Sequence, residues 1–351
     1  MALVGPCPGT WQRRVHQRRE PRRVGLCLGQ RGSPPRGGWT SRDPGPSLQP
    51  CFWPAVAARE ACGAVIRGPG PSNPEGILVT NPNPNPLEAI DAWRGCASFL
   101  WLAALLAWES SAPYFHQYDT WEARQRHGLR NLAAAVANAV MVGVVFAGLW
   151  RGLAAWAGQH GFGLLNWVAA SWPSALRVLA AIVLLDAWTY AWHRASHEIP
   201  WLWRFHRVHH SDPTMDVTTA SRFHPGEIGI SSVLRLALIP LLGVRFGELV
   251  LYETLLQFLV QLQHANVALP PSLDRIVGLV FVTPGMHKVH HSVERRETDS
   301  NYGSLGSFWD RIFGTFRSRP DPENIRFGLV GEDAEESQTL RALWRRPWDR
   351  P

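Results

Sequence analysis

Apolar residues concentrate after residue 96 of this chain, and the stretch before it is polar. Residues 1–95 are rich in Arg, Pro and Gly without helical or strand periodicity, and the alternating run Asn81–Pro86 cannot continue a helix. This composition predicts a disordered tail or, equally, an over-extended gene start, with the working protein beginning near Ile77 or Leu87.

Four stretches between residues 97 and 192 predict helices in or at a membrane. Leu132–Leu149 contains eighteen residues without a charge, close to the about 20 that cross a bilayer. Ala97–Trp108 is shorter and predicts a first span, and Val178–Trp192 predicts a further span. Ala155–Pro173, which contains several tryptophans, suits a segment at the membrane interface.

A longer apolar stretch, Ile228–Gln263, is broken near Gly243 and has room for two crossings or for a hairpin that dips in and returns. The loop holding Arg124, Arg126 and Arg130 is expected to be cytoplasmic, because short cytoplasmic loops are enriched in basic residues. The predicted fold class is therefore all-α: an integral-membrane helical bundle of about four to five spans or re-entrant segments.

We expect the membrane domain to occupy residues 96–320 and a cytosolic C-terminal tail to occupy residues 321–351. This tail mixes basic and acidic residues, and a short helix is expected at Glu335–Trp344, packed on the site. The net charge of +7 could suggest a nucleic-acid partner, but eleven of the arginines fall in the first 67 residues, without a recognition motif. A nucleic-acid partner is therefore excluded.

Eight of the fourteen histidines occur in three clusters with helical spacing. Residues three and four apart share a helix face, so each cluster offers two or three imidazoles to one point. Neutral imidazole is a common metal ligand, whereas burying that many unpaired imidazoles would cost several kcal/mol. The clusters therefore predict a metal site, and their number fits two ions better than one. They comprise His193, His197, His206, His209, His210, His287, His290 and His291.

Other polar residues are candidates to complete or support this site. His264, at the end of the apolar hairpin, is expected to be a ninth ligand. Asp186 shares a helix face with His193, and metal-bound imidazoles usually donate their other N–H to a carboxylate or carbonyl. Asp186 is therefore expected to support a ligand, with Tyr190 beside it, or to reach interfacial water. His224 is interpreted mainly as structural. We interpret four more as packed or surface residues: His16, His116, His127 and His160.

At these residues the chain resembles the sterol desaturase and fatty acid hydroxylase superfamily of membrane non-haem di-iron enzymes. The resemblance rests on HRASH, HRVHHSD, RFHPGE, QHANV, TPGMHKVHHS and the closing DSNYG…WDRIFGTF, and it covers roughly Ala97–Pro320. It implies a small bundle of transmembrane helices with a cytosolic helical cap that carries the histidine clusters. It also implies that the histidines of the three clusters, with His264, bind two Fe ions. Asn266, Asn301 and Asp310 lie in these motifs and are expected to hydrogen-bond near the ligands or to pack the cap.

The resemblance implies an O2-dependent hydroxylation or desaturation of a C–H bond in a sterol, fatty acyl chain or related membrane lipid. No cytochrome b5-like segment is visible, so the electrons are expected from a separate electron-transfer protein or a pterin. Two alternatives stay open at this point: a metal-binding membrane protein without redox chemistry, and a zinc hydrolase on the same scaffold. The HExxH motif of many zinc hydrolases does not occur in the chain.

Overall fold

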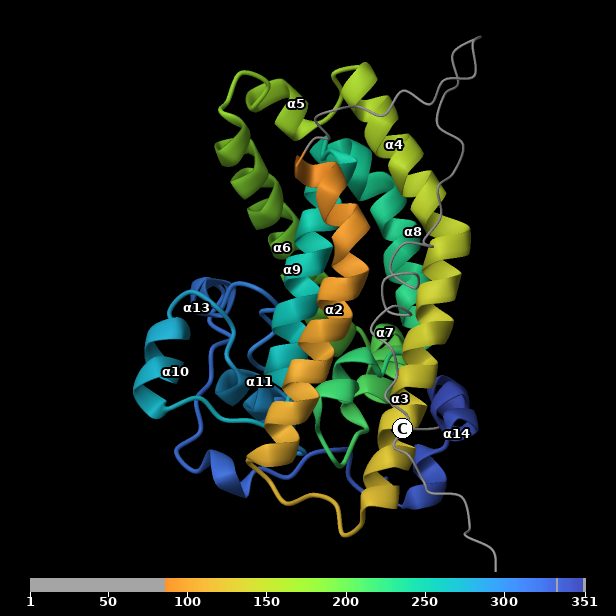
Figure 1. Cartoon of the computed structure of the whole chain (residues 1–351), viewed down its shortest axis with the longest axis vertical. Helices are drawn as coiled ribbons and strands as arrows, with labels where there is room; N and C mark the ends of the chain where they lie inside the picture. Colours follow the sequence, from red (N-terminus) through yellow and green to blue (C-terminus); the bar gives the residue numbers. More distant parts are fainter. Residues whose placement is uncertain (1–85, 333, 350–351) are drawn as a thin grey trace, which may run out of the picture. The chain divides into compact units, whose positions relative to one another are not determined.

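The computed structural model describes residues 86–332 and 334–349, so the predicted tail before residue 86 lies outside the described residues. The described part is built from helices, with two isolated β-bridges and no ladder of strands. The long helices run roughly along the vertical of Figure 1, and shorter helices gather at their lower end. The predicted all-α fold is confirmed. Three helical segments are long and apolar enough to cross a membrane, namely Trp121–Val168, Ser174–Glu198 and Pro225–Leu242.

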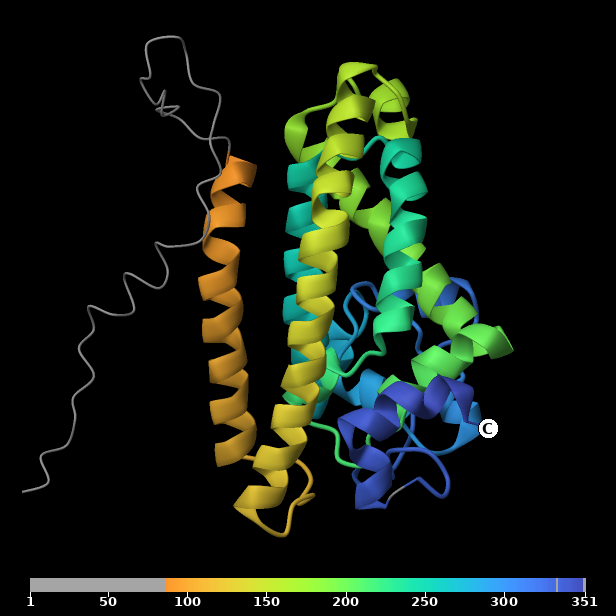
Figure 2. The same ribbon diagram turned by 90° about the vertical axis from the view of Figure 1, so that its right-hand side faces the viewer.

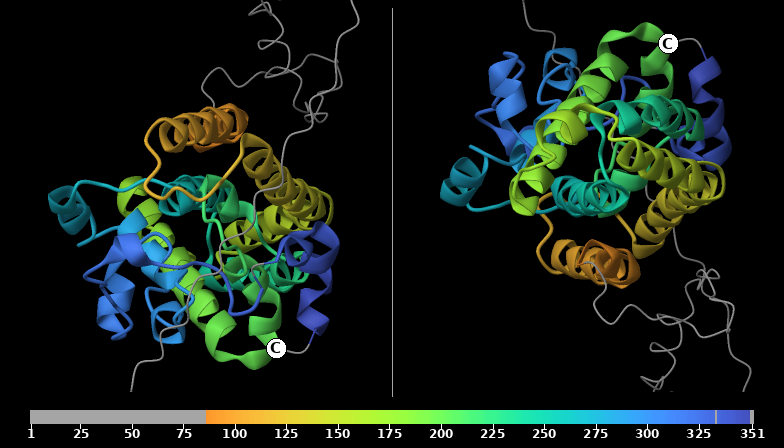
Figure 3. Two further views of the ribbon diagram at one scale, coloured as in Figure 1. Left: turned by 90° about the horizontal axis from the view of Figure 1, so that it is seen from below. Right: turned by 90° about the horizontal axis from the view of Figure 1, so that it is seen from above.

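The first described helix, α2 (Pro86–Ser111), begins inside the stretch that the sequence predicted to be non-helical. The prediction was wrong for residues 86–95 because Pro86 stands at the first helical position, where a fixed φ and a missing N–H are tolerated. Figures 2 and 3 place α2 on the outside of the bundle. It packs on α9 (Phe246–His264), where the indole N–H of Trp101 donates to the carbonyl of Phe258 at 2.9 Å.

One long helical rod contains the predicted span Leu132–Leu149. It consists of α3 (Trp121–Met141), a π-helical turn η1 (Val142–Phe146) and α4 (Ala147–Gln159). The hydroxyl of Thr120 caps its first turn by accepting from the backbone N–H of Ala123 at 3.2 Å. The predicted interfacial segment holds the end of α4 and the short helix α5 (Leu164–Val168), at the end of the bundle far from the cap (Figure 1).

The apolar stretch after residue 225 forms two helices, α8 (Pro225–Leu242) and α9, which lead away from the cap and back to it (Figure 1). Gly243 ends α8 with a φ of 67°, a left-handed conformation that favours glycine. A Cβ atom there would also lie only 2.9 Å from the carbonyl oxygen of Phe162. The chain therefore returns to the cap, as both interpretations of Ile228–Gln263, two crossings or a hairpin that dips in and returns, required.

A buried ion pair fixes the end of the bundle that is far from the cap. Arg177, in α6 (Ser174–Glu198), bonds the carboxylate of Glu248 in α9 at 3.0 Å. Its guanidinium also donates to the carbonyl oxygens of Leu165 and Gly243, at 2.6 and 2.9 Å. A buried guanidinium needs such partners for its several N–H groups. This cluster joins α5, α6 and the turn between α8 and α9.

The cap is made of short helices from five parts of the chain. The predicted C-terminal helix Glu335–Trp344 is present in two pieces, with Thr339 capping the second through the backbone N–H of Ala342. This segment packs behind α7, because Arg207 of α7 donates to the carbonyl of Asp349 at 2.8 Å. The cap elements are α7 (Pro200–His210), η2 (Val217–Ser221), α10 (Pro271–Val277), α11 (Pro284–His290), α12 (Arg295–Thr298), α13 (Phe308–Ile312), η3 (Pro322–Asn324), η4 (Glu335–Gln338), α14 (Leu340–Arg345) and η5 (Arg346–Trp348).

Candidate metal centre

Four helix ends deliver the clustered histidines to one place. α6 ends at Glu198, one residue after His197, and Pro200 starts α7 at the position where proline is preferred. His264 is the last residue of α9. Pro284 likewise starts α11, whose first turn is capped by the hydroxyl of Thr283. Short helices with defined starts therefore fix the direction in which each imidazole points.

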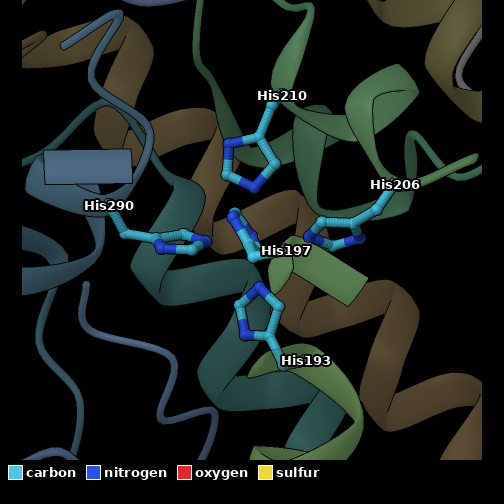
Figure 4. A group of neighbouring side chains, drawn as sticks. All are labelled: His193, His197, His206, His210 and His290. Carbon is cyan, nitrogen blue, oxygen red and sulfur yellow. The ribbon is translucent and has the colours of Figure 1, made fainter. Parts of the chain in front are cut away.

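The structure brings all nine predicted histidines together in two adjacent groups. Within each group the ring nitrogens that could serve as ligands lie within 4.8 Å of one another. Figure 4 shows the first group, whose rings point toward a common centre. The first group is His193, His197, His206, His210 and His290. The second group is His209, His264, His287 and His291.

Each HxxHH motif contributes to both groups. In α7, His206 and His210 are four residues apart and join the first group, while His209 joins the second. In α11, His287 and the residue four positions later, His291, join the second group, while the histidine between them joins the first. Residues i and i+4 lie on one helix face. The spacing of these motifs therefore serves two neighbouring sites rather than one.

Backbone carbonyls orient three of these imidazoles. Nδ1 of His193 lies 2.8 Å from the carbonyl of Tyr302, and Nδ1 of His290 lies 2.6 Å from that of Ser300. Nδ1 of His264 lies 2.7 Å from the carbonyl of Val260. A carbonyl oxygen can only accept a hydrogen bond, so Nδ1 must carry the hydrogen, and Nε2 of each neutral ring is then unprotonated. An unprotonated nitrogen is the form that binds a metal.

The remaining nitrogens fit metal ions better than they fit each other. Nε2 of His264 lies 3.1 Å from Nε2 of both His209 and His287. Three neutral imidazoles cannot satisfy one another in this way, whereas nitrogens bound at about 2.0–2.1 Å to one ion lie roughly 3 Å apart. Seven of the nine histidines also carry a buried ring nitrogen with no hydrogen-bond partner within the described residues. The donor set therefore suits two metal ions.

Burial keeps the cap histidines neutral. It lowers the pKa of His209, His210, His287 and His291 well below the ordinary histidine value, and the neighbouring imidazoles lower each further. Burial lowers the pKa of His290 to about 3, although the carbonyl of Ser300 opposes the shift. Metal binding requires neutral imidazole. These residues are therefore in the ligating form at neutral pH.

Glu227 supports the first group, and the sequence interpretation missed it. Its carboxylate lies 2.8 Å from Nδ1 of His206 in the buried interior of the cap. The residue stands in the first turn of α8, within the RFHPGE motif. This is the carboxylate–histidine pairing that was expected of Asp186. The sequence signal that could have revealed this role is the glutamate of RFHPGE, which stands two residues after the proline that starts α8.

We expect the variant Glu227→Gln to bind metal about 10–100-fold more weakly, because losing the carboxylate partner of a ligand costs that much in metal affinity or activity. Titration of the metal-free protein with Fe²⁺ or Co²⁺, followed by absorbance, measures the change. The control is Glu323→Gln, at an exposed glutamate of η3. Equal affinity in Glu227→Gln and the control would show that this carboxylate does not support the site.

Asp186 does not bond His193, so that prediction was wrong. Its carboxylate accepts from the backbone N–H of Leu305 and Gly306, at 3.1 and 2.9 Å, and from the indole of Trp309 at 2.8 Å. Asp186 and His193 do lie seven residues apart on one helix, but the loop before α13 lies against the carboxylate and takes up its hydrogen bonds. Asp186 therefore anchors the loop whose neighbouring carbonyl, at position 302, orients His193.

The other predicted supporting residues hold cap loops rather than imidazoles. Asp310 accepts from the backbone N–H of Tyr302 and Gly303, at 2.7 and 2.9 Å. Asn301, at a φ of 52°, donates to the carbonyl of Met286 at 3.0 Å. Asn266 donates to the carbonyl of Phe115 at 2.8 Å. These side chains fix the backbone around α11 and the end of α9.

Two further predicted residues are packing groups. The hydroxyl of Tyr190 lies 2.8 Å from that of Thr315, and its ring stacks on Phe313. His224 caps α8, because its Nδ1 accepts from the backbone N–H of Gly226 at 2.8 Å. The structural interpretation of His224 agrees with this position.

His127 pairs with two buried carboxylates, a role that the interpretation as a packed or surface residue did not include. Its Nε2 lies 2.8 Å from Asp212, and its Nδ1 lies 3.2 Å from Asp216. Both carboxylates are buried. Asp212 also accepts from the hydroxyl of Thr219 at 2.7 Å. This network ties α3 to the loop that leaves α7, and the aspartate of HRVHHSD was its sequence signal.

A cavity of about 600 Å³ leads from the bundle to the histidines. Apolar side chains of η1 and α9 form much of its wall, among them Val142, Leu249, Val250 and Leu256. A half-buried ion pair between Arg235 and Glu253 also faces it. The end of the cavity at the cap is lined by His193, His206, His209, His264 and His287.

Comparison with known proteins identifies the region that contains this site. Residues 178–315 match the family model described as fatty acid hydroxylase. The chain is 35% identical over 169 residues to the ornithine lipid hydroxylase OlsE of Rhizobium tropici, covering 47% of this chain and 49% of that protein. No solved structure matches the chain significantly.

The chain is also similar to two relatives whose names describe other lipid substrates. Alkylglycerol monooxygenase of Caenorhabditis elegans is 28% identical over 191 residues, which are 51% of this chain and 35% of the relative. A cholesterol 25-hydroxylase-like protein of Danio rerio is 32% identical over 151 residues, which are 41% of this chain and 58% of the relative. The chain thus spans about half the length, or less, of most of these relatives. The relatives named here are lipid hydroxylases and monooxygenases.

Proposed function

We propose a function from the premise that this chain belongs, through residues 178–315, to the sterol desaturase and fatty acid hydroxylase superfamily. The protein is an O2-dependent di-iron enzyme that hydroxylates a C–H bond of a membrane lipid. The observation that carries this proposal is the joining of two histidine groups to an apolar cavity between helices that could span a membrane.

The nine histidines would hold two iron ions, five imidazoles around one and four around the other. Bound iron supplies the activation of O2. The chain itself keeps the imidazoles neutral and excludes water from them, because all nine side chains are at least nine-tenths buried. The cavity wall orients the lipid so that one C–H bond lies at the histidine end.

The proposed reaction needs a reductant. Insertion of one oxygen atom of O2 into a C–H bond converts the other to water and takes up two electrons and two protons. The nine histidines would be occupied in holding the metal ions. We assign the supply of electrons to a separate electron-transfer protein or to a pterin.

The metal and O2 uptake test the proposal. Protein purified from iron-replete cells is expected to contain about two irons per chain and to consume O2 when a reductant and lipid are supplied. The products are measured by mass spectrometry with ¹⁸O2, which labels a hydroxyl group. Stoichiometric zinc without O2 uptake would contradict the proposal and favour a hydrolase or a metal-binding protein.

The cap would face the cytoplasm. Arg130 of α3 bonds Glu335 of the C-terminal segment at 2.6 Å, so the basic turn of α3 lies at the cap end of the bundle. Short loops rich in Lys and Arg stay in the cytoplasm. A protease added outside the cells should cleave a C-terminal tag only after the membrane has been made permeable. Cleavage of the tag in intact cells would contradict this orientation.

We expect Gly143→Leu to lower kcat/KM for the lipid by about tenfold or more, because small volume changes in an apolar substrate site have effects of that size. Gly143 lines the cavity, and a Cβ atom there would meet no heavy atom within 4 Å, so the added side chain has room without disturbing the fold. Metal content should not change. Turnover of the lipid and metal analysis measure the two quantities separately.

The matched control is Gly148→Leu, on the same rod. A Cβ atom there also meets nothing within 4 Å, but the residue does not line the cavity. Equal loss of activity in both variants would mean that the cavity does not hold the substrate.

A further inference from the structure

An apolar surface lies on the cap, outside the helices that could span a membrane. Ile276 is 65% exposed, Leu279 is 62% exposed and Ile312 is 64% exposed. Single exposed apolar residues are normal, but a contiguous group of them marks an interaction surface. We call this surface the α10–α13 face. Its members are Leu273, Ile276, Leu279, Val280, Phe281, Ile312, Phe313 and Phe316, each at least 41% exposed.

Backbone hydrogen bonds make this surface continuous. The turn after α10 pairs with the residues before α13, because the N–H of Val282 donates to the carbonyl of Leu305 at 3.1 Å. The N–H of Ser307 donates to the carbonyl of Val280 at 2.9 Å. Phe281 and Gly306 form a bridge between these two segments. The apolar side chains of α10 and α13 therefore belong to one surface rather than to two separate loops.

This surface adjoins α6 at a level above the histidines. The carboxylate of Asp186 holds the segment before α13, and the ring of Phe313 stacks on Tyr190 with centroids 5.2 Å apart. Asp186 is seven residues before His193, or about 10 Å farther from the cap along the helix. Figure 1 shows α13 beside the lower part of α6. The α10–α13 face thus continues the outward surface of a candidate span, whose Leu179 is 55% exposed.

Cationic side chains border the α10–α13 face. Leu279 and Phe316 of the face line a cavity of about 610 Å³. The same cavity is lined by Arg275, Arg311, Arg317 and Arg319, with Asp274 as the acidic residue among its lining. Arg319 pairs with Glu297 and Asp321. Arg275 and Arg317 make no ion pair within residues 86–332 and 334–349. Guanidinium groups bind phosphate through paired N–H donors.

We propose that the α10–α13 face is embedded in the interfacial layer of the bilayer, with the arginines of its cavity at the phosphates of anionic phospholipids. An apolar face bordered by arginines is the pattern of segments that lie in a membrane interface. The continuity with α6 selects the bilayer over a soluble partner, because the same surface already meets lipid tails if α6 crosses the membrane. The inference does not depend on the metal or on the reaction.

Photolabelling of the full-length protein in nanodiscs tests the proposal. The probe is a phospholipid with a diazirine on the acyl chain near its ester, and labelled residues are mapped by mass spectrometry. Labels are expected on residues 276–281 and 312–316, as well as around Leu179 of α6, which serves as the positive control. Val330 is 86% exposed on the cap and serves as the negative control. Labels on α6 without labels on α10 and α13 would overturn the proposal.

A second measurement tests the charge. The probe made as phosphatidylglycerol should label Phe316 more strongly than the probe made as phosphatidylcholine. In the double variant Arg275→Gln, Arg317→Gln this preference should fall by about fivefold for each guanidinium removed. Equal labelling by both probes would contradict an anionic lipid as the occupant. Neither readout requires activity, so failure here is separate from failure of the proposed function.

Discussion

Replacing His209 by alanine is expected to abolish lipid turnover, lowering it by about 100-fold or more, since losing only a partner of a metal ligand already costs 10–100-fold. His209 belongs to the group of four, in which its Nε2 lies 3.1 Å from that of His264. Removing it leaves three imidazoles around that point. Metal analysis should therefore show the loss of about one ion per chain, beside the loss of product.

The control for this variant is His116→Ala, at an exposed histidine that belongs to neither group. It should keep both its metal and its activity. Full activity in His209→Ala would remove the group of four from the reaction. Loss of product with unchanged metal would mean that His209 acts on the substrate instead.

The variant Asp186→Asn is expected to destabilise the protein by about 3 kcal/mol, because buried N–H donors lose a carboxylate acceptor. The asparagine amide would face the N–H groups of Gly306 and Trp309, which now donate at 2.9 and 2.8 Å. The midpoint of thermal unfolding should fall by roughly 6 °C or more. Metal binding should weaken with it, since the same loop carries the carbonyl that orients His193.

Asp119→Asn provides the comparison, because Asp119 is exposed. Thermal unfolding followed by intrinsic fluorescence in detergent or nanodiscs measures both variants. If Asp186→Asn unfolds at the same temperature as this control, Asp186 does not anchor the loop.

The clustering of the histidines could be predicted from sequence because it depends on the spacing of residues within single helices. The intervals within α7 and α11 place imidazoles on one face, and the even number of passes through Ile228–Gln263 returns His264 to the same end. Local spacing did not reveal that each HxxHH motif divides between two groups. That division depends on how α7 and α11 face each other across the cap, which is set by tertiary packing.

The supporting residues were harder to predict because their partners are distant in sequence. Asp186 accepts from residues about 120 positions later, and Glu227 reaches a histidine 21 positions earlier. Helical spacing assigned the first to His193 because no sequence rule indicates which loop folds back onto α6. The start of α2 was missed for a local reason. The Asn–Pro repeat obscured a proline that stands where a helix begins.

The buried imidazoles also make the rate at which the chain is degraded depend on the supply of the metal. Each buried polar group without a partner costs about 1–3 kcal/mol, and binding of metal to deprotonated ligands recovers that energy. Seven of the nine histidines carry such a nitrogen within the described residues. Changes of about 1–2 kcal/mol already alter cellular abundance several-fold through proteolysis. Newly made chains in cells starved of the metal should therefore be degraded sooner, even at constant messenger RNA.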